Sequence, residues 1–144
     1  MFLSCRNSSE NKKTTRVKPE SNSTDSNITL RTDHSVNEQG GKALYKKYCL
    51  TCHQSNGSGV PGIYPPLGQG SWVGKNPNDL ISIILKGLSG EIEVNGERYK
   101  NSMPLQNKIT DEELAKVLTY IRSNFGNNFE PVTPDRVKKA RSTQ

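Results

Sequence analysis

The pattern of apolar and polar positions predicts three helices separated by loops. In the first, residues 36–48, apolar and aromatic side chains recur at spacings that gather on one side of a helix. These side chains are Ala43, Leu44, Tyr45 and Tyr48. Gly40 and Gly41 lower the helix propensity of this stretch, so we expect another backbone to pass close to them. Residues 54–67 are rich in Gly, Pro, Ser and Asn and predict a loop.

A second helix is predicted directly after Asn76-Pro77, a capping residue followed by a proline suited to the first helical turn. Its end is predicted at Gly87. Most of its circumference is apolar, which indicates a buried helix, and the apolar positions are Leu80, Ile81, Ile83, Ile84, Leu85 and Leu88. Residues 92–99 then alternate around Asn95-Gly96, a strong short-range pattern for a β-hairpin.

The last helix is predicted from Thr110 to about Phe125, before Gly126. Thr110 and Glu113 have the spacing of a capping box, and acidic residues fill the first turn. The apolar face consists of Leu114, Val117, Leu118 and Ile121, with Tyr120 beside them. These elements predict an all-α fold of three main helices with one short hairpin before the last helix.

The 144 residues leave room for one domain, because both ends of the chain are polar. We expect a flexible linker over residues 1–35, a folded domain over residues 36–130 and a basic, disordered tail over residues 131–144. Lys and Arg outnumber Asp and Glu by six to four, ten to nine and four to one in these segments. The domain itself is nearly neutral and has no basic stripe with interleaved aromatics, so nucleic acid is not an expected partner.

The chemistry of the chain centres on Cys49-Leu50-Thr51-Cys52-His53, which has the spacing of a covalent c-type haem attachment site. Two thiols three positions apart can add across the two vinyl groups of one porphyrin edge, and the next residue, His53, is then held under the iron. A thioredoxin-like pair would need a βαβ pattern, which is missing here. A zinc site would need two further ligands, and the candidates, Cys5 and His34, lie in the polar linker.

Met103 is the expected sixth ligand of the iron. It is the only methionine besides the initiator, and it lies in the loop between the hairpin and the last helix, from which a thioether can reach an iron. The alternative role is that of a flexible gap-filler in the core. A proline carbonyl in the loop after His53, from Pro65 or Pro66, would accept the Nδ1 proton and orient the ring.

The first five residues, ending in Ser4-Cys5, look like the end of a bacterial lipoprotein signal, in which the cysteine bears the lipid. The alternative is an unpaired thiol in a disordered leader. A lipid on Cys5 would tether the domain to a membrane surface through the linker. Haem attachment to such a motif normally takes place outside the bacterial cytoplasm, so we expect the periplasm or the outer face of a bacterial membrane.

Over about residues 38–126 the chain resembles the class I c-type cytochromes, which are small electron carriers. The resemblance implies thioether bonds at Cys49 and Cys52, axial ligation by His53 and Met103, and a hydrogen bond from His53 to the carbonyl of Pro65. It implies one haem enclosed by the three helices. It also implies that the first and last helices cross closely, with Gly41 against Tyr120.

The loops resemble a bacterial subgroup of this family, which includes the cytochrome domains fused to copper nitrite reductases and the cytochrome subunits of quinoprotein dehydrogenases. The similar stretches are Tyr64-Pro65-Pro66-Leu67, Ser71-Trp72-Val73-Gly74 and the hairpin. Within them, Trp72 would either donate its indole N–H to a haem propionate or pack in the core. The near balance of charges in the domain argues against docking by a strongly positive face.

The resemblance implies a monomeric one-electron carrier that moves electrons between donor and acceptor proteins, without catalysis of its own. The alternative is a haem enzyme or gas sensor with a labile sixth ligand. A peroxidase would need an acid–base group near the iron, yet the sequence has only two histidines, and His34 lies in the linker.

Overall fold

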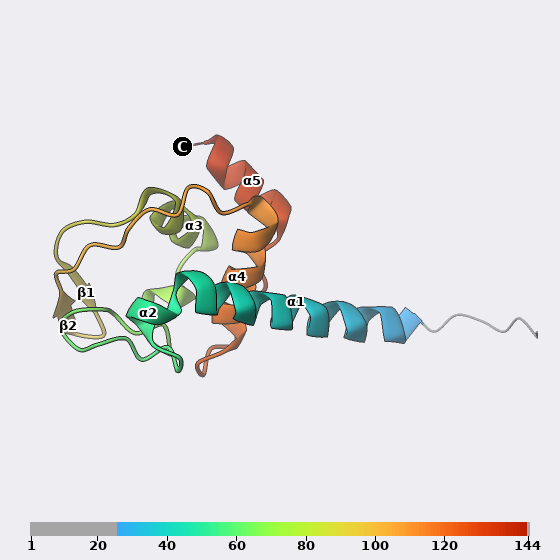
Figure 1. Cartoon of the computed structure of the whole chain (residues 1–144), viewed down its shortest axis with the longest axis horizontal. Helices are drawn as coiled ribbons and strands as arrows, with labels where there is room; N and C mark the ends of the chain where they lie inside the picture. Colours follow the sequence, from blue (N-terminus) through green and yellow to red (C-terminus); the bar gives the residue numbers. More distant parts are fainter. Residues whose placement is uncertain (1–25, 144) are drawn as a thin grey trace, which may run out of the picture.

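The structure is a computed structural model that describes the backbone of residues 26–143 and the side chains of residues 37–143. It is predominantly helical, with one two-stranded hairpin, as predicted (Figure 1). Its elements in chain order are α1 (Ser26–Tyr48), α2 (Leu50–His53), a 3₁₀ helix η1 (Trp72–Gly74), α3 (Pro77–Lys86), β1 (Ile92–Val94), β2 (Glu97–Tyr99), α4 (Asp111–Ser123) and α5 (Pro134–Ser142).

Helix α1 begins ten residues before the predicted position. The sequence predicted a flexible linker up to residue 35, whereas residues 26–35 continue the helix. A helix that is already nucleated gains one hydrogen bond for each residue it adds, so a polar stretch can extend it. The proposed lipid site, Cys5, and the rest of residues 1–25 lie outside the described residues.

Helices α1 and α4 cross at Gly41, as the resemblance implied (Figure 1). A Cβ atom at Gly41 would lie 2.5 Å from the carbonyl oxygen of Lys116 and 2.7 Å from the Cβ atom of Tyr120. Only a residue without a side chain permits this approach. The crossing places Tyr45 and Tyr120 together with Phe125 in one aromatic cluster, with ring centroids 5.1–5.8 Å apart.

Helix α3 and the hairpin have the predicted ends. The side chain of Asn76 accepts a hydrogen bond from the backbone N–H of Asn78 at 3.0 Å, and the helix stops at Gly87, which has φ 76°. In the hairpin, Ile92 pairs with Tyr99 and Val94 with Glu97. Its turn consists of Asn95 and Gly96, whose φ angles of 54° and 80° suit a two-residue turn.

Helix α4 begins at the predicted capping box. The N–H of Glu113 donates to Oγ1 of Thr110 at 3.2 Å, and the N–H of Thr110 donates to the Glu113 carboxylate at 3.1 Å. The helix ends at Ser123, two residues before the predicted end. Phe125 and Gly126 follow with φ angles of 58° and 80°, which turn the chain away from the helix.

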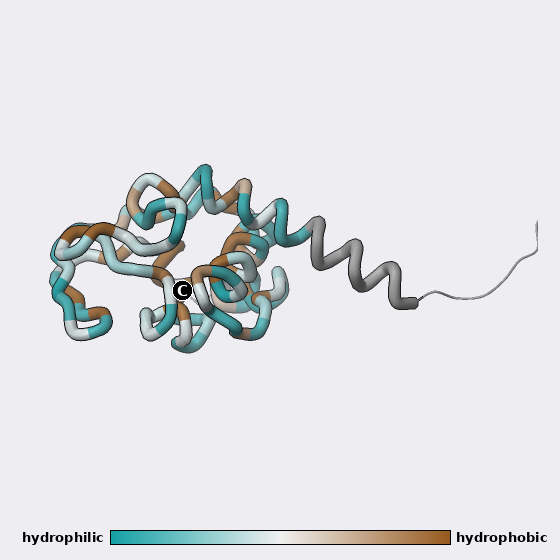
Figure 2. The backbone as a smooth tube through the Cα atoms, turned by 90° about the horizontal axis from the view of Figure 1, so that it is seen from below, coloured by the Kyte–Doolittle hydropathy of each residue, from teal (hydrophilic) through white to brown (hydrophobic). Residues whose placement is uncertain are grey.

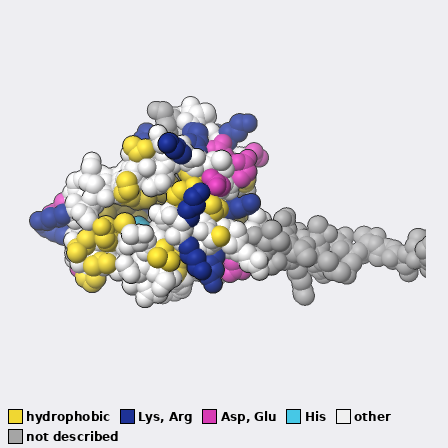
Figure 3. All heavy atoms as spheres, in the orientation of Figure 1, with side chains coloured by type: hydrophobic (Ala, Val, Ile, Leu, Met, Phe, Trp, Pro, Cys, Tyr) yellow, Lys and Arg dark blue, Asp and Glu magenta, His cyan; other side chains and the backbone are white. Residues whose placement is uncertain are grey.

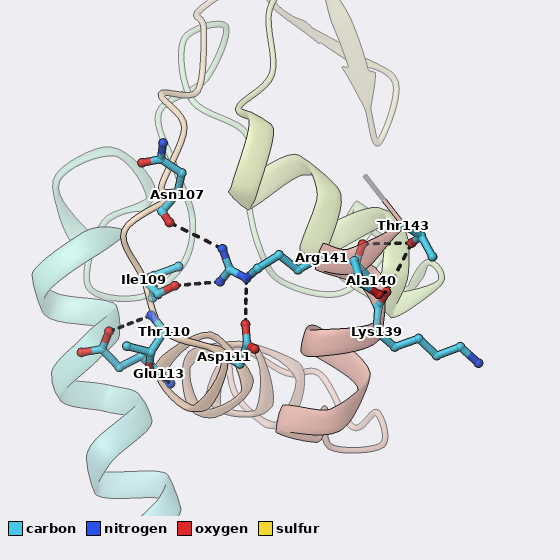
Figure 4. A network of polar contacts seen from close by, with 10 residues as sticks. Asn107, Ile109, Thr110, Asp111, Glu113, Lys139, Ala140, Arg141 and Thr143 are labelled. Carbon is cyan, nitrogen blue, oxygen red and sulfur yellow. Dashed lines mark hydrogen bonds and ion pairs between the residues drawn. The ribbon is translucent and has the colours of Figure 1, made fainter.

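The prediction of a disordered tail over residues 131–144 is wrong. Residues Pro134–Ser142 form α5, which buries Val137 and Ala140 against α3 and α4. The helix is held at its far end by Arg141, whose guanidinium donates to Asp111 at 2.8 Å and to the carbonyl of Ile109 at 2.8 Å (Figure 4). Its few apolar residues lie among basic ones, so the composition of this segment did not indicate a packed helix.

The apolar residues form short stretches separated by hydrophilic ones (Figure 2). No helix in the described part of the chain is long and apolar enough to cross a membrane. The core residues come mainly from α3, α4 and α5, and the least exposed side chains are Tyr45, Ile81, Leu114, Leu118, Val117 and Val137.

Candidate haem-binding site

Helices α2, α3 and α4, together with η1, β1 and the connecting loops, line a cavity whose walls are strongly apolar. Cys49, Cys52, His53 and Met103 all line it. The cavity holds about 950 Å³ of empty space, including its opening to solvent, and Figure 3 shows apolar side chains around a small area in the colour of histidine. Its apolar walls include Leu67, Val73, Leu80, Ile84, Leu118 and Ile121.

The end of α1 and the short helix α2 bring both thiols and the histidine to one side of the chain. The N–H of Cys49 donates to the carbonyl of Tyr45 at 2.8 Å, and the N–H of His53 donates to the carbonyl of Cys49 at 2.9 Å. Helical spacing across the motif therefore directs these three side chains to the same cavity. Both cysteine side chains are partly buried, and they form no disulfide with each other.

His53 is held in one ring orientation. It is 9% exposed, and its Nδ1 nitrogen lies 2.9 Å from the carbonyl oxygen of Pro65. A carbonyl can only accept, so Nδ1 carries the proton and Nε2 keeps its lone pair. Burial lowers the pKa of His53, and the hydrogen bond to Pro65 opposes this effect. Of the two prolines considered from the sequence, Pro65 makes the contact that the resemblance implied.

The environment of the thiols disfavours a dithiol redox site. Burial, and then the proximity of Cys52, raise the pKa of Cys49 to about 12. Reactive cysteine pairs instead have a thiol with a lowered pKa. A zinc site is also disfavoured, because within residues 37–143 no three His, Cys, Asp or Glu side chains are grouped to hold a metal ion. An apolar cavity with two thiols and one neutral imidazole fits a covalently bound haem.

Met103 reaches the cavity from the segment that follows the hairpin. Its N–H donates to the carbonyl of Leu88 at 2.8 Å, and the N–H of Leu88 donates back to its carbonyl at 3.0 Å. Just beyond it, the N–H of Gln106 donates to the carbonyl of Ile84 at 2.8 Å. These bonds tie the loop to the end of α3, so backbone contacts determine the position of Met103 independently of its side chain.

Trp72 lines the cavity and is only partly buried, so it is not a packed core residue. Its indole N–H donates to the carbonyl of Glu93 in β1 at 3.1 Å. The amine of Lys75 lies 3.8 Å from the centre of the ring, which is half-buried. Trp72 therefore connects η1 to the hairpin and forms a wall of the site between them.

Arg122 is a structural residue of the site that sequence reasoning missed. It is 5% exposed and donates to the carbonyls of Val73 at 2.7 Å and Glu130 at 2.9 Å. Burial lowers the pKa of its guanidinium. These bonds attach η1, which forms a wall of the cavity, to α4. A clue was available, since Arg122 follows Leu114 and Leu118 at the helical spacing of the apolar face.

Comparisons with known proteins agree with this site. The cytochrome c family model matches residues 38–125. Cytochrome c-552 of Thermus thermophilus is 38% identical over 111 residues, covering 71% of this chain and 84% of the Thermus protein. The fructose dehydrogenase cytochrome subunit of Gluconobacter japonicus is 37% identical over 129 residues, covering 84% of this chain and 25% of that subunit.

A further relative is the cytochrome c subunit of the quinone-dependent alcohol dehydrogenase of Gluconobacter oxydans strain 621H. It is 30% identical over 107 residues, covering 72% of this chain and 22% of that subunit. The family match includes the attachment motif, Met103 and all of α4. The chain therefore belongs to the cytochrome c family and has one covalently bound c-type haem.

Proposed function

We propose that this protein is a one-electron carrier whose iron is ligated by His53 and Met103. The observation that carries the proposal is that both side chains line one apolar cavity together with Cys49 and Cys52. A c-type haem, when bound, supplies the exchange of one electron between ferric and ferrous iron. In this proposal the two cysteines attach the group, and the imidazole and thioether occupy both axial positions.

The residues of the cavity favour electron transfer over catalysis. Its lining contains no Asp, Glu, Lys or Arg side chain within the described part of the chain. His53 already donates its Nδ1 proton to Pro65, so it is not free to act as an acid–base group. The apolar walls exclude water, and a thioether ligand favours the reduced state. Pockets of haem enzymes usually bring acid–base groups together, which this lining does not do.

For partners, we propose a dehydrogenase or a membrane-bound complex as the electron donor and an oxidase or reductase as the acceptor. Two of the relatives are cytochrome subunits of dehydrogenases, which supports a donor of this kind. We further propose a monomer in the periplasm or on the outer face of a bacterial membrane. The proposed lipid on Cys5 is tested by the mass of the mature N-terminus: an acylated cysteine supports the tether, and an unmodified thiol rejects it.

Replacement of Met103 by alanine tests the ligand assignment. Because the loop is held by backbone bonds to Leu88, we expect M103A to keep its helical content while its iron accepts added imidazole readily in the ferric state. L105A is the matched control, since Leu105 lies in the same loop and is 52% exposed. The ferric sulfur-to-iron charge-transfer band should disappear in M103A and persist in L105A. A band retained in M103A would reject Met103 as a ligand.

A further inference from the structure

The residue directly after the proposed iron ligand has a strained backbone. Gln54 has φ 63° and ψ 165°, a region that almost only glycine occupies. Such a conformation is strained in any other residue and persists only where surrounding contacts enforce it. The contacts that hold Gln54 therefore also determine the backbone position of His53.

The carbonyl of Gln54 accepts two hydrogen bonds. The hydroxyl of Tyr45 donates to it at 2.6 Å, and the N–H of Gly57 donates at 3.2 Å. The N–H of Gln54 itself continues the helical pattern by donating to the carbonyl of Leu50 at 2.9 Å. The bond from Tyr45 is the shorter of the two on the carbonyl, and it is the one made by a side chain.

The hydroxyl of Tyr45 is a donor on a tightly packed, buried ring. Tyr45 is 1% exposed, and its ring packs against those of Tyr120 and Phe125, whose centroids are 5.6 and 5.1 Å away. Burial, and then the proximity of Cys49, raise the pKa of Tyr45, so the hydroxyl keeps its proton. The packing of the ring serves the crossing of α1 and α4, but that crossing does not require the hydroxyl.

We propose that the hydroxyl of Tyr45 makes this residue a positioning residue for His53, acting through Gln54. The hydrogen bond enforces the strained turn after His53. The carbonyl of His53 is in turn held by the N–H of Gly59 at 3.0 Å, and its ring by Pro65. This inference rests on the proposed function, in which His53 ligates the iron.

Loss of the hydroxyl has a predictable effect on the iron. A looser backbone at Gln54 weakens the hydrogen bond from His53 to Pro65, which normally makes the imidazole a stronger donor. A weaker donor stabilises ferric iron less, so the reduction potential rises. The ratio of ferrous to ferric protein at a fixed applied potential should increase about two- to fivefold. A change of this size corresponds to part of the free energy of one hydrogen bond.

The test compares Y45F with Y120F in the haem-loaded protein. Both substitutions remove one hydroxyl from the same aromatic cluster, but that of Tyr120 has no hydrogen-bond partner among the described residues. We expect Y45F to speed amide hydrogen exchange of Gly57 and Gly59 about fivefold relative to the amide of Leu118 in α4, and to raise the potential. We expect Y120F to do neither. Equal behaviour of the two variants in both measurements would overturn the proposal.

A second substitution links the effect to Gln54. Glycine adopts the observed conformation without strain. We therefore expect Y45F to speed amide exchange at Gly59 by a smaller factor in a Q54G background than in the wild-type background. The same factor in both backgrounds would refute the role of Gln54. The wild-type spectrum separates the two claims. An iron without a histidine ligand refutes the proposed function. Normal ligation, with the same exchange rates and reduction potential in Y45F and Y120F, refutes only this inference.

Discussion

Two adjacent glycines in α1 are expected to respond in opposite ways to replacement by alanine. At Gly41 a new Cβ atom would lie 2.5 Å from the carbonyl oxygen of Lys116 and 2.7 Å from the Cβ atom of Tyr120. At Gly40 the nearest atom would be the side-chain Cδ of Lys116, at 3.6 Å. The first contact involves the backbone of α4 and cannot be relieved by a rotamer change, whereas the second is an ordinary contact with a flexible chain.

The magnitudes follow from two opposing effects. Alanine in a helix interior is favoured over glycine by about 0.5–1 kcal/mol. Forcing an extra carbon into a packed contact costs about 1–3 kcal/mol, and the cost at Gly41 lies at the upper end because α1 and α4 must separate. We therefore expect G41A to lower the free energy of unfolding by about 1–2 kcal/mol, and G40A to raise it by about 0.5–1 kcal/mol.

The assay is equilibrium denaturation of the haem-loaded protein by guanidinium chloride, followed by far-ultraviolet circular dichroism. The two variants should move the midpoint in opposite directions at an unchanged slope. The reasoning would be refuted if G41A were as stable as the wild type, or if G40A were destabilised to the same degree. Either result would mean that the close crossing of α1 and α4 does not limit residue size at position 41.

Two other substitutions test the newly found parts of the fold. R122M would leave the carbonyls of Val73 and Glu130 without their buried donor and should cost about 2–4 kcal/mol of stability. R122K should lose less stability because it keeps one donor. Equal losses in the two variants would contradict a role of these hydrogen bonds in stability. V137A should cost about 1–3 kcal/mol because Val137 is fully buried, while K138A on the exposed side of α5 should stay within about 0.5 kcal/mol of the wild type in the same denaturation assay. A negligible effect of V137A would show that α5 does not contribute to the core.

Local rules predicted the parts of the fold that local chemistry determines. The cap at Asn76, the capping box of Thr110 and the Asn95-Gly96 turn each satisfy backbone groups within a few residues, so their positions could be recognised from spacing alone. The attachment motif could also be recognised from its spacing, because its two thiols and its histidine must lie within about one helical turn. The position of Gly41 followed from the resemblance to a known family.

Features that depend on distant contacts could not be predicted in this way. Helix α5 is stabilised by burial of Val137 and Ala140 and by the bonds of Arg141 to Asp111 and Ile109. None of these partners can be recognised from the tail itself, whose composition is that of a disordered segment. The partner of Trp72, the carbonyl of Glu93, likewise depends on how η1 meets the hairpin.

The hydroxyl of Tyr45 illustrates the same limit within the site. A tyrosine at this position is equivalent to any aromatic residue as far as the hydrophobic pattern is concerned. Its bond to Gln54 exists because α2 ends at His53 and the chain turns at Gln54, which brings the Gln54 carbonyl to the Tyr45 hydroxyl. The sequence therefore predicted residues that line the cavity but not the hydrogen bond from Tyr45 to Gln54.

The central claim is that protein side chains occupy both axial positions of the iron. The most direct test is the visible spectrum of the dithionite-reduced wild-type protein before and after addition of carbon monoxide. We predict a sharp low-spin c-type spectrum that carbon monoxide leaves unchanged, because Met103 holds the sixth position. A clear shift to a carbonyl spectrum would contradict the claim and would identify an open or labile iron site, as in a gas sensor or a peroxidase-like enzyme.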